Sequence, residues 1–129
     1  MPGLLLVDDN PEYARLLAGF LSDKGYQCST CASAGEALRA LEHGRFDAVA
    51  VDLILTDSPG LTVVLACRSR RIPVVLLTPL DEADTLSRRL CPAGTPVVTK
   101  IARFDVIEQA ISHAIMEKRL YQAAKPTDT

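Results

Sequence analysis

The stretch LLLVDDNPE, residues 4–12, places a strand signal, a pair of acids and a helix start next to one another. Its first part, Leu4 to Val7, is a continuous apolar run of strand length. Such runs are typical of strands that are buried on both faces of a parallel sheet. Asn10 is a helix-capping residue, Pro11 suits the first helical position and Glu12 suits the first turn. The stretch therefore predicts a buried strand that leads through an acidic loop into a helix.

The same alternation of strand and helix continues through the chain. Further strand signals lie at residues 27–31, 48–51, 74–77 and 97–98. Helical spacing and capping residues indicate helices over residues 11–25, 33–44, 61–71, 81–90 and 104–120. Five strands that alternate with five helices predict a doubly wound α/β fold, in which helices cover both faces of a parallel sheet. The flavodoxin-like strand order 2-1-3-4-5 is the natural choice at this length.

Length and composition restrict the number of domains and the class of partner. The 129 residues, of which 48% are hydrophobic, suffice for one sizeable core and leave no room for a second domain. We expect one domain over residues 1–120 and a flexible C-terminal tail over residues 121–129. A net charge of −2 argues against a dominant nucleic-acid or membrane surface. The apolar run at Leu4 to Val7 is too short for a signal peptide or a membrane span, so the sequence predicts a soluble, cytoplasmic protein.

Two of the four cysteines, Cys28 and Cys31, form a C-x-x-C pair. The pair lies in a predicted strand, where residues three apart point to opposite faces. We expect one sulfur to face the core and the other to face solvent. No second C-x-x-C is present to complete a zinc site, so these thiols are interpreted as structural.

Polar residues follow four of the predicted strands, at the edge where parallel α/β sheets bind ligands. The acids Asp8 and Asp9 follow the first strand, Asp52 ends the third, Thr78 ends the fourth and Lys100 lies near the end of the fifth. Clustered carboxylates repel unless a cation neutralises them, and a set of oxygen ligands suits Mg²⁺. A carboxylate beside Mg²⁺ can attack phosphorus, and a hydroxyl and an ammonium can bind the other phosphoryl oxygens.

These residues lie in segments that resemble the receiver domain of bacterial response regulators, including the stand-alone chemotaxis type, along almost the whole chain. The segment LLVDDN at residues 5–10 resembles the acidic pair of that family, and VDL at residues 51–53 resembles its phosphoacceptor segment. Gly60 lies where the following loop usually has glycine. VVLLT at residues 74–78 resembles the strand that ends in the switch hydroxyl, and Lys100 follows Thr78 by twenty-two positions, as the lysine of the family does.

The resemblance implies a metal site and a phosphoacceptor. Asp9 and Asp52 would bind Mg²⁺ directly, Asp8 would help through water, and the main-chain oxygen of Ile54 would be the third protein ligand. Asp52 would accept a phosphoryl group from a sensor histidine kinase or a phosphotransfer protein.

The resemblance also implies a role in signalling. Asp52, Thr78 and Lys100 would carry out only the chain's own phosphotransfer and dephosphorylation, so the chain would be a signalling phosphoacceptor of a two-component phosphorelay and not an enzyme in the ordinary sense. A downstream protein would bind the face formed by residues 81–90, 97–98 and 104–120, with no direct contact to nucleic acid or membrane. A homodimer is left open.

Three positions depart from the pattern of the family. Pro79 replaces the small residue whose N–H would donate to the phosphoryl group, and proline has no N–H. Ile101 replaces the proline that usually follows the lysine through a cis bond. A cis bond before a non-proline residue costs roughly 2.5–4 kcal/mol, so we expect a trans peptide here. Val97 stands in place of the switch aromatic. The resemblance also places two apolar residues, Ile54 and Leu80, beside the path of the hydrolytic water.

Other interpretations remain. About nine residues follow Leu120, too few for a DNA-binding unit, so we expect no attached output domain. Alternatively the chain is a piece of a larger protein into which residues 116–121 lead. A second hypothesis is an atypical receiver that binds partners without phosphorylation. A third is a flavodoxin-like redox protein on the same fold, although the acidic loop after the first strand would repel a flavin phosphate.

Overall fold

The computed structural model describes residues 1–79, residue 89 and residues 91–124. Its centre is a parallel sheet with the strand order β2-β1-β3-β4-β5, which confirms the flavodoxin-like order predicted from the sequence. The strands are β1 (Gly3–Val7), β2 (Gln27–Cys31), β3 (Ala48–Asp52), β4 (Val74–Thr78) and β5 (Val97–Thr99). Every residue of β3 and β4 is buried, and each strand is apolar up to its last residue, which is Asp52 in β3 and Thr78 in β4.

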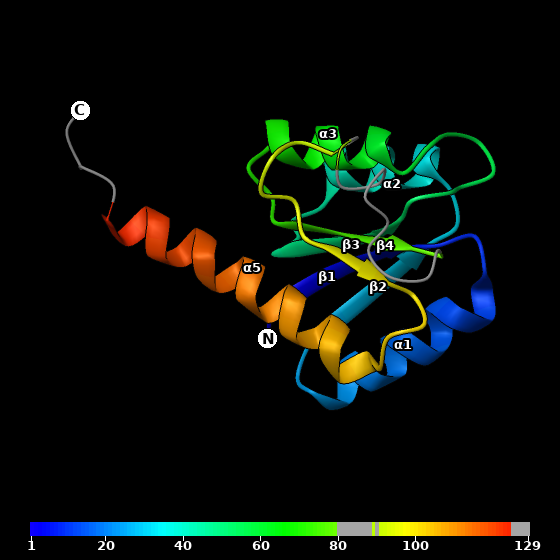
Figure 1. Ribbon diagram of the computed structural model, residues 1–129, viewed down its shortest axis with the longest axis horizontal. Coiled ribbons are helices and arrows are strands. Elements are labelled where there is room, and N and C mark those ends of the chain that lie inside the picture. Colours follow the sequence, from blue (N-terminus) through cyan, green and yellow to red (C-terminus); the bar gives the residue numbers. More distant parts are fainter. Residues whose placement is uncertain (80–88, 90, 125–129) are drawn as a thin grey trace.

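Helices cover both faces of this sheet (Figure 1). They are α1 (Pro11–Asp23), α2 (Ala34–His43), α3 (Leu61–Ser69) and α5 (Phe104–Ala124). Figure 1 shows α2 and α3 on one face and α1 and α5 on the other. The helix expected over residues 81–90 falls outside the described residues, apart from residue 89. Among the helices that the structure describes, none is both long and apolar enough to cross a membrane.

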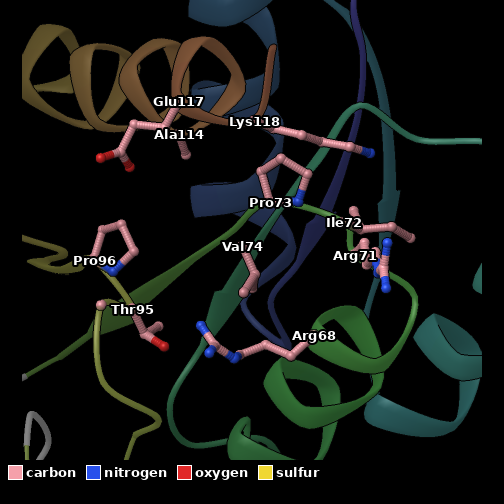
Figure 2. A pocket seen from close by; sticks show the side chains of 11 residues that line it. Arg68, Arg71, Ile72, Pro73, Val74, Thr95, Pro96, Ala114, Glu117 and Lys118 are labelled. Carbon is pink, nitrogen blue, oxygen red and sulfur yellow. The ribbon is translucent and has the colours of Figure 1, made fainter. Parts of the chain in front are cut away.

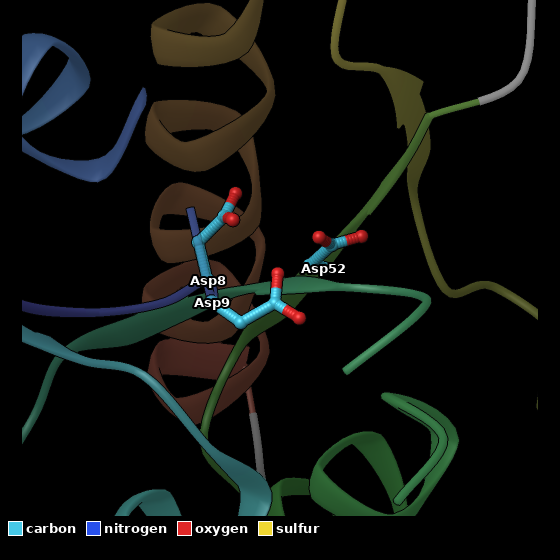
Figure 3. Close-up of side chains that lie close together, drawn as sticks. All are labelled: Asp8, Asp9 and Asp52. Carbon is cyan, nitrogen blue, oxygen red and sulfur yellow. The ribbon is translucent and has the colours of Figure 1, made fainter. Parts of the chain in front are cut away.

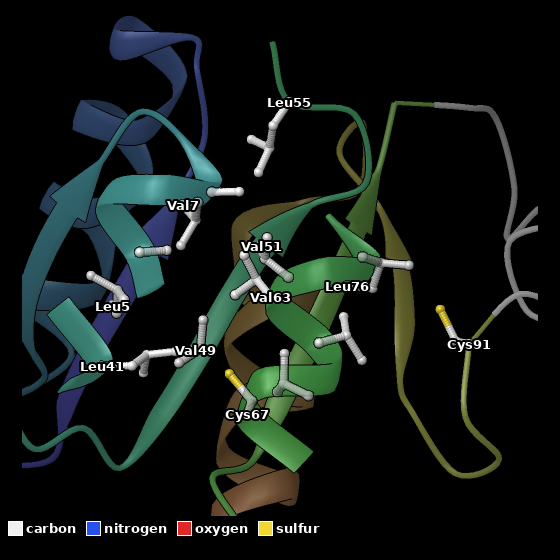
Figure 4. Packing of buried hydrophobic residues seen from close by; sticks show 14 of the residues in the cluster. Leu5, Val7, Leu41, Val49, Val51, Leu55, Val63, Cys67, Leu76 and Cys91 are labelled. Atoms are coloured by element: carbon white, nitrogen blue, oxygen red, sulfur yellow. The ribbon is translucent and has the colours of Figure 1, made fainter. Parts of the chain in front are cut away.

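The two faces of the sheet carry separate hydrophobic cores, because successive residues of a strand point to opposite sides. In β1, Leu5 and Val7 pack toward α2 and α3, whereas Leu4 and Leu6 pack toward α1 and α5. Figure 4 shows the first of these cores, with side chains of α3 such as Cys67 among those of the sheet. The two cores fix the strands, and so fix where each strand ends.

The Cys28–Cys31 pair divides between these two cores. Cys28 packs against the core beneath α1 and α5, and Cys31 packs against the core beneath α2 and α3. The prediction that the sulfurs face opposite sides is therefore correct. The prediction that one faces solvent is wrong, because both faces of the sheet are covered and both residues are partly buried.

The last helix is longer than the sequence analysis predicted. Helix α5 continues past Leu120 to Ala124, so the expected domain boundary at residue 121 lies inside a helix. Residues 121–124, Tyr-Gln-Ala-Ala, contain no helix breaker, and the next proline is Pro126. The end of α5 extends away from the sheet (Figure 1).

Candidate functional site

Three carboxylates meet where β1 and β3 end (Figure 3). The two strands are neighbours, with Val7 paired to Val51, so Asp8 and Asp9 come beside Asp52. Each acid offers one oxygen that lies within 4.8 Å of the other two. Asp8 and Asp52 are only 5% and 4% exposed, and Asp9 is partly exposed. The side chains that the sequence analysis placed on one rim therefore form a compact, mostly buried acidic cluster.

The other two predicted site residues lie at the same edge. Thr78, fully buried, ends β4, and the main-chain N–H of Lys100 donates to its carbonyl at 2.8 Å. The Lys100 ammonium lies 3.2 Å from Asp52 Oδ2 and 2.7 Å from Asp8 Oδ2. The peptide from Lys100 to Ile101 is trans, which confirms the prediction for this bond. Five of the residues singled out in the sequence, Asp8, Asp9, Asp52, Thr78 and Lys100, are thus neighbours in space.

The loop after β3 is shaped by the close approach of two backbone segments. The main-chain N–H of Ile54 donates to Asp52 Oδ1 at 3.1 Å, and the N–H of Gly60 donates to the carbonyl of Leu53 at 2.7 Å. A Cβ atom on Gly60 would lie 2.0 Å from the carbonyl oxygen of Asp52. Glycine is required at position 60 because the backbone of Asp52 and Leu53 passes against it.

Burial and the neighbouring opposite charge shift the pKa of Asp52, and that of Lys100, in opposite directions. Burial raises the pKa of the Asp52 carboxyl, and the Ile54 N–H and the Lys100 ammonium only partly offset it. Burial disfavours the charged form of Lys100, but its contacts with Asp8 and Asp52 outweigh burial and raise its pKa. Lys100 therefore stays protonated and neutralises part of the charge of the acids.

The cluster fits a hard divalent cation. All three acids offer carboxylate oxygens, which Mg²⁺ prefers. Asp8 Oδ2 is buried and lies 2.7 Å from the Lys100 ammonium, and a carboxylate oxygen with this one contact keeps acceptor capacity. One lysine for three carboxylates leaves net negative charge at the site, which a cation would neutralise.

Tyr13 is a site residue that the sequence analysis missed. Its ring lies under the Lys100 ammonium, 4.4 Å from ring centroid to Nζ, and its hydroxyl donates to the carbonyl of Lys100 at 3.2 Å. Burial first, and then the charges of Asp8 and Asp52, raise the pKa of Tyr13 to about 12. The sequence signals only an apolar position in the first turn of a helix, which looks like a core residue.

Asp57 is a second polar residue that the sequence analysis missed. Its two carboxylate oxygens accept hydrogen bonds from the main-chain N–H groups of Ala34 and Gly35, both at 3.0 Å. These bonds lower the pKa of Asp57 and tie the loop after β3 to the start of α2. Asp57 is therefore a structural acid, separate from the cluster.

The three departures from the family pattern have different surroundings. Pro79 is exposed directly after β4, whereas Val97 is buried at the start of β5. Ile101 is 69% exposed next to the site lysine. Leu80, one of the two apolar residues expected near the hydrolytic water, lies outside the described residues; Ile54, the other, is exposed.

A separate cleft of about 280 Å³ lies at the opposite edge of the sheet, where β4 and β5 begin (Figure 2). Its walls include Arg68, Arg71, Pro73, Pro96 and Lys118, and none of the three clustered acids lines it. The acidic cluster is thus a site of its own at the carboxyl ends of the strands.

Comparisons with known proteins point to one family. The curated relatives include the "Probable transcriptional regulatory protein TcrX" of Mycobacterium tuberculosis, 33% identical over 75% of this chain and 42% of that protein. The "Sensor histidine kinase RcsC" of Escherichia coli is 31% identical over 84% of this chain and 12% of that protein. The chain thus spans less than half the length of either relative.

A solved structure agrees with these relatives. The response regulator protein TrrA from Thermotoga maritima, crystallised in complex with Mg²⁺-BeF, is 27% identical, with a TM-score of 0.76 over 88% of this chain and 99% of that one. The family model of the response regulator receiver domain matches residues 4–112. With the five-stranded sheet and the acidic edge described above, this match shows that the chain belongs to the response regulator receiver domain family.

Proposed function

We propose that Asp52 is the phosphoacceptor of this receiver domain and that Lys100 and Thr78 bind the phosphoryl group that it receives. The observation that carries the proposal is the ion pair between Lys100 and Asp52 at 3.2 Å, in a pocket of three carboxylates that, among the described residues, pairs with the Lys100 ammonium alone. Asp52 is positioned by two independent constraints, the Ile54 N–H and the glycine at position 60. A rigid carboxylate that faces a cation is suited to in-line attack on phosphorus.

Asp9 and Asp52 would hold Mg²⁺ directly, the main-chain oxygen of Ile54 would complete the protein ligands, and Asp8 would act through water. When bound, Mg²⁺ would neutralise negative charge on the phosphoryl oxygens and on the acids. The TrrA structure, which contains Mg²⁺-BeF, supports this assignment. Asp8 Oδ2 is buried and pairs with Lys100 but accepts no hydrogen bond from the described residues, which supports the assignment from within this chain.

The transfer forms one bond and breaks one bond. A carboxylate oxygen of Asp52 attacks the phosphorus of a phosphohistidine, the new oxygen–phosphorus bond forms an acyl phosphate, and the phosphorus–nitrogen bond of the donor breaks. The electron pair of that bond returns to the donor imidazole. Lys100 and the Thr78 hydroxyl would contact the phosphoryl oxygens, where the transferred charge is spread.

A sensor histidine kinase or a phosphotransfer protein would supply the phosphoryl group. Receiver domains are signalling modules, and a related sequence occurs within the sensor histidine kinase RcsC. The downstream partner would be a protein that binds the face that includes β5 and α5. The third part of the expected face, residues 81–90, lies outside the described residues apart from residue 89.

One observation favours a second candidate, an atypical receiver that binds partners without phosphorylation. Pro79 follows Thr78 and has no N–H to offer a phosphoryl group, and Val97 cannot act as an aromatic switch. A charge-assisted hydrogen bond contributes on the order of 1.5–3 kcal/mol, so its loss would weaken the phosphorylated state. The intact Asp9, Asp52, Thr78 and Lys100 favour phosphorylation.

Incubation with Mg²⁺ and acetyl phosphate, followed by intact mass measurement, distinguishes the two candidates. The proposal expects the wild-type chain to gain the mass of one phosphoryl group and Asp52→Asn to gain none. A wild-type chain that gains no mass, with Mg²⁺ and donor in excess, would reject the phosphoacceptor and leave the atypical receiver.

A further inference from the structure

Lys100 follows a short strand and precedes an exposed residue. Strand β5 contains only three residues, and the next residue after Lys100, Ile101, is 69% exposed. The long lysine side chain has four flexible carbon–carbon bonds, and fixing it costs side-chain entropy. The ammonium is nevertheless held 3.2 Å from Asp52. Besides its ion pairs with Asp8 and Asp52, contacts from outside the strand can fix the direction of this side chain.

Tyr13 contacts Lys100 twice, from a different element. The ring of Tyr13 lies 4.4 Å from the ammonium, which is cation–π geometry, and the Tyr13 hydroxyl donates to the Lys100 carbonyl at 3.2 Å. One residue of α1 thus holds both the charged end of Lys100 and its backbone. The ammonium also forms an ion pair with Asp8, and the Tyr13 ring lies beneath the ammonium.

The Tyr13 ring is itself held in place. Its main-chain N–H donates to the Asn10 side chain at 3.1 Å, so it belongs to the capped first turn of α1. The Tyr13 ring packs in a T-shaped arrangement with Phe104, the first residue of α5, with centroids 5.7 Å apart and ring planes at 88°. The ring is therefore a fixed surface on which the flexible lysine rests.

We propose that Tyr13 is a positioning residue, which directs the Lys100 ammonium toward Asp52 through its ring and fixes the Lys100 backbone through its hydroxyl. This inference rests on the proposed phosphoacceptor function. Tyr13 does not touch the phosphoryl group; it acts through Lys100. Its ring contributes more than its hydroxyl, because the cation–π contact is partly desolvated and the hydroxyl bond is long.

Three variants separate positioning from simple packing. Tyr13→Phe keeps the ring and removes the hydroxyl, and Tyr13→Leu removes both. Phe20→Leu is the matched control, because Phe20 lies on the same helix, packs on the same Phe104 at 5.7 Å and carries its own cation–π contact with Lys24.

The first readout needs neither metal nor phosphoryl donor. An aromatic ring shifts the NMR resonances of protons above its face upfield, so the terminal methylene of Lys100 should be shifted in metal-free wild type. Lys100→Met assigns the signal. The shift should persist in Tyr13→Phe and in Phe20→Leu, and should disappear in Tyr13→Leu. A Lys100 methylene without an upfield shift in wild type would overturn the proposal.

The second readout is the initial rate of Asp52 labelling by acetyl phosphate below saturation, with Mg²⁺ in excess. Tyr13→Phe should slow labelling about three-fold, as the loss of one weak hydrogen bond implies. Tyr13→Leu should slow it about five- to thirty-fold relative to Phe20→Leu, which corresponds to a desolvated cation–π contact.

The outcomes separate this proposal from the function on which it rests. If wild type is labelled and Tyr13→Leu is labelled as fast as Phe20→Leu, only the role of Tyr13 is rejected. If wild type takes no label at all, the phosphoacceptor function fails, and the role of Tyr13 fails with it.

Discussion

The Lys100 ammonium lies closer to Asp8, at 2.7 Å, than to Asp52, at 3.2 Å. Both acids are buried, and their charge in the metal-free protein is compensated by this shared cation and by the main-chain N–H groups of Asn10 and Ile54, which donate to Asp8 Oδ1 and Asp52 Oδ1. Asp9 is the third acid of the cluster and has no ion pair among the described residues. The three carboxylates thus differ in their ion pairs, although Asp8 and Asp9 are neighbours in the sequence.

Because Asp8 pairs with Lys100 and Asp9 does not, substitutions of the two acids should have opposite effects on the stability of the metal-free protein. Asp9→Asn removes a repulsive charge and no ion pair, so it should raise the free energy of unfolding by about 1 kcal/mol. Asp8→Asn removes a buried partner of Lys100 and should lower it by about 1–3 kcal/mol. Thermal unfolding in the presence of a chelator measures both. A lower melting temperature for Asp9→Asn would contradict the account of Asp9 as a repulsive charge without an ion pair.

Binding of Mg²⁺ should depend on the same cluster. Asp9→Asn removes a direct ligand where carboxylate oxygens are the main protein donors, so the affinity for Mg²⁺ should fall roughly ten-fold or more, about 1.4 kcal/mol. Calorimetric titration of the metal-free protein gives the affinity. The control is Asp23→Asn, which removes an equal charge from the exposed end of α1. Equal affinities for wild type and Asp9→Asn would reject the metal assignment.

The sequence predicted the fold because buried parallel strands are continuous apolar runs, and those of β1, β3 and β4 are unambiguous. It predicted the acidic cluster because parallel strands end at one edge. Tyr13 could not be found in this way, since its contact with Lys100 joins residues 87 positions apart and an aromatic in a first helical turn is usually core. The extension of α5 was missed because the buried apolar stripe of the helix ends at Ile115. The exposed last turn adds no apolar residue to that stripe and so gives no periodic signal.

The close approach at Gly60 predicts a steric effect on the acceptor. An alanine Cβ at position 60 would lie 2.0 Å from the carbonyl oxygen of Asp52. Gly60 has φ of −58°, which any residue can adopt, so the strain would come from this steric clash and not from the backbone dihedral angle. Gly60→Ala should lower the free energy of unfolding by about 1–3 kcal/mol and slow labelling of Asp52. Gly19→Ala is the control, because nothing lies within 4 Å of a Cβ there. It should raise stability by about 0.5–1 kcal/mol. If both variants behave alike, the contact at Gly60 is not restrictive.

The lifetime of the phosphorylated state should depend on Ile54. Its side chain is 58% exposed beside Asp52 and cannot orient a water molecule by hydrogen bonding. Ile54→Asn should speed hydrolysis of the acyl phosphate by about ten-fold, less than a positioned general base contributes. A time course of phosphoprotein after removal of the donor measures the rate. Leu65→Asn, an equally exposed position on α3, is the control. An unchanged or slower rate in Ile54→Asn would contradict an apolar gate.

Reduction of the labelled protein with borohydride tests the central claim, that Asp52 is the phosphoacceptor, most directly. Borohydride converts an aspartyl phosphate to homoserine and leaves a free carboxylate unchanged, so peptide mass spectrometry locates the acceptor. After treatment with Mg²⁺ and acetyl phosphate, we predict homoserine at position 52 in the wild-type chain and no such product in Asp52→Asn or in protein without donor. Homoserine at position 8 or 9 instead, or no reduced residue in a chain that has gained phosphoryl mass, would contradict the assignment of Asp52.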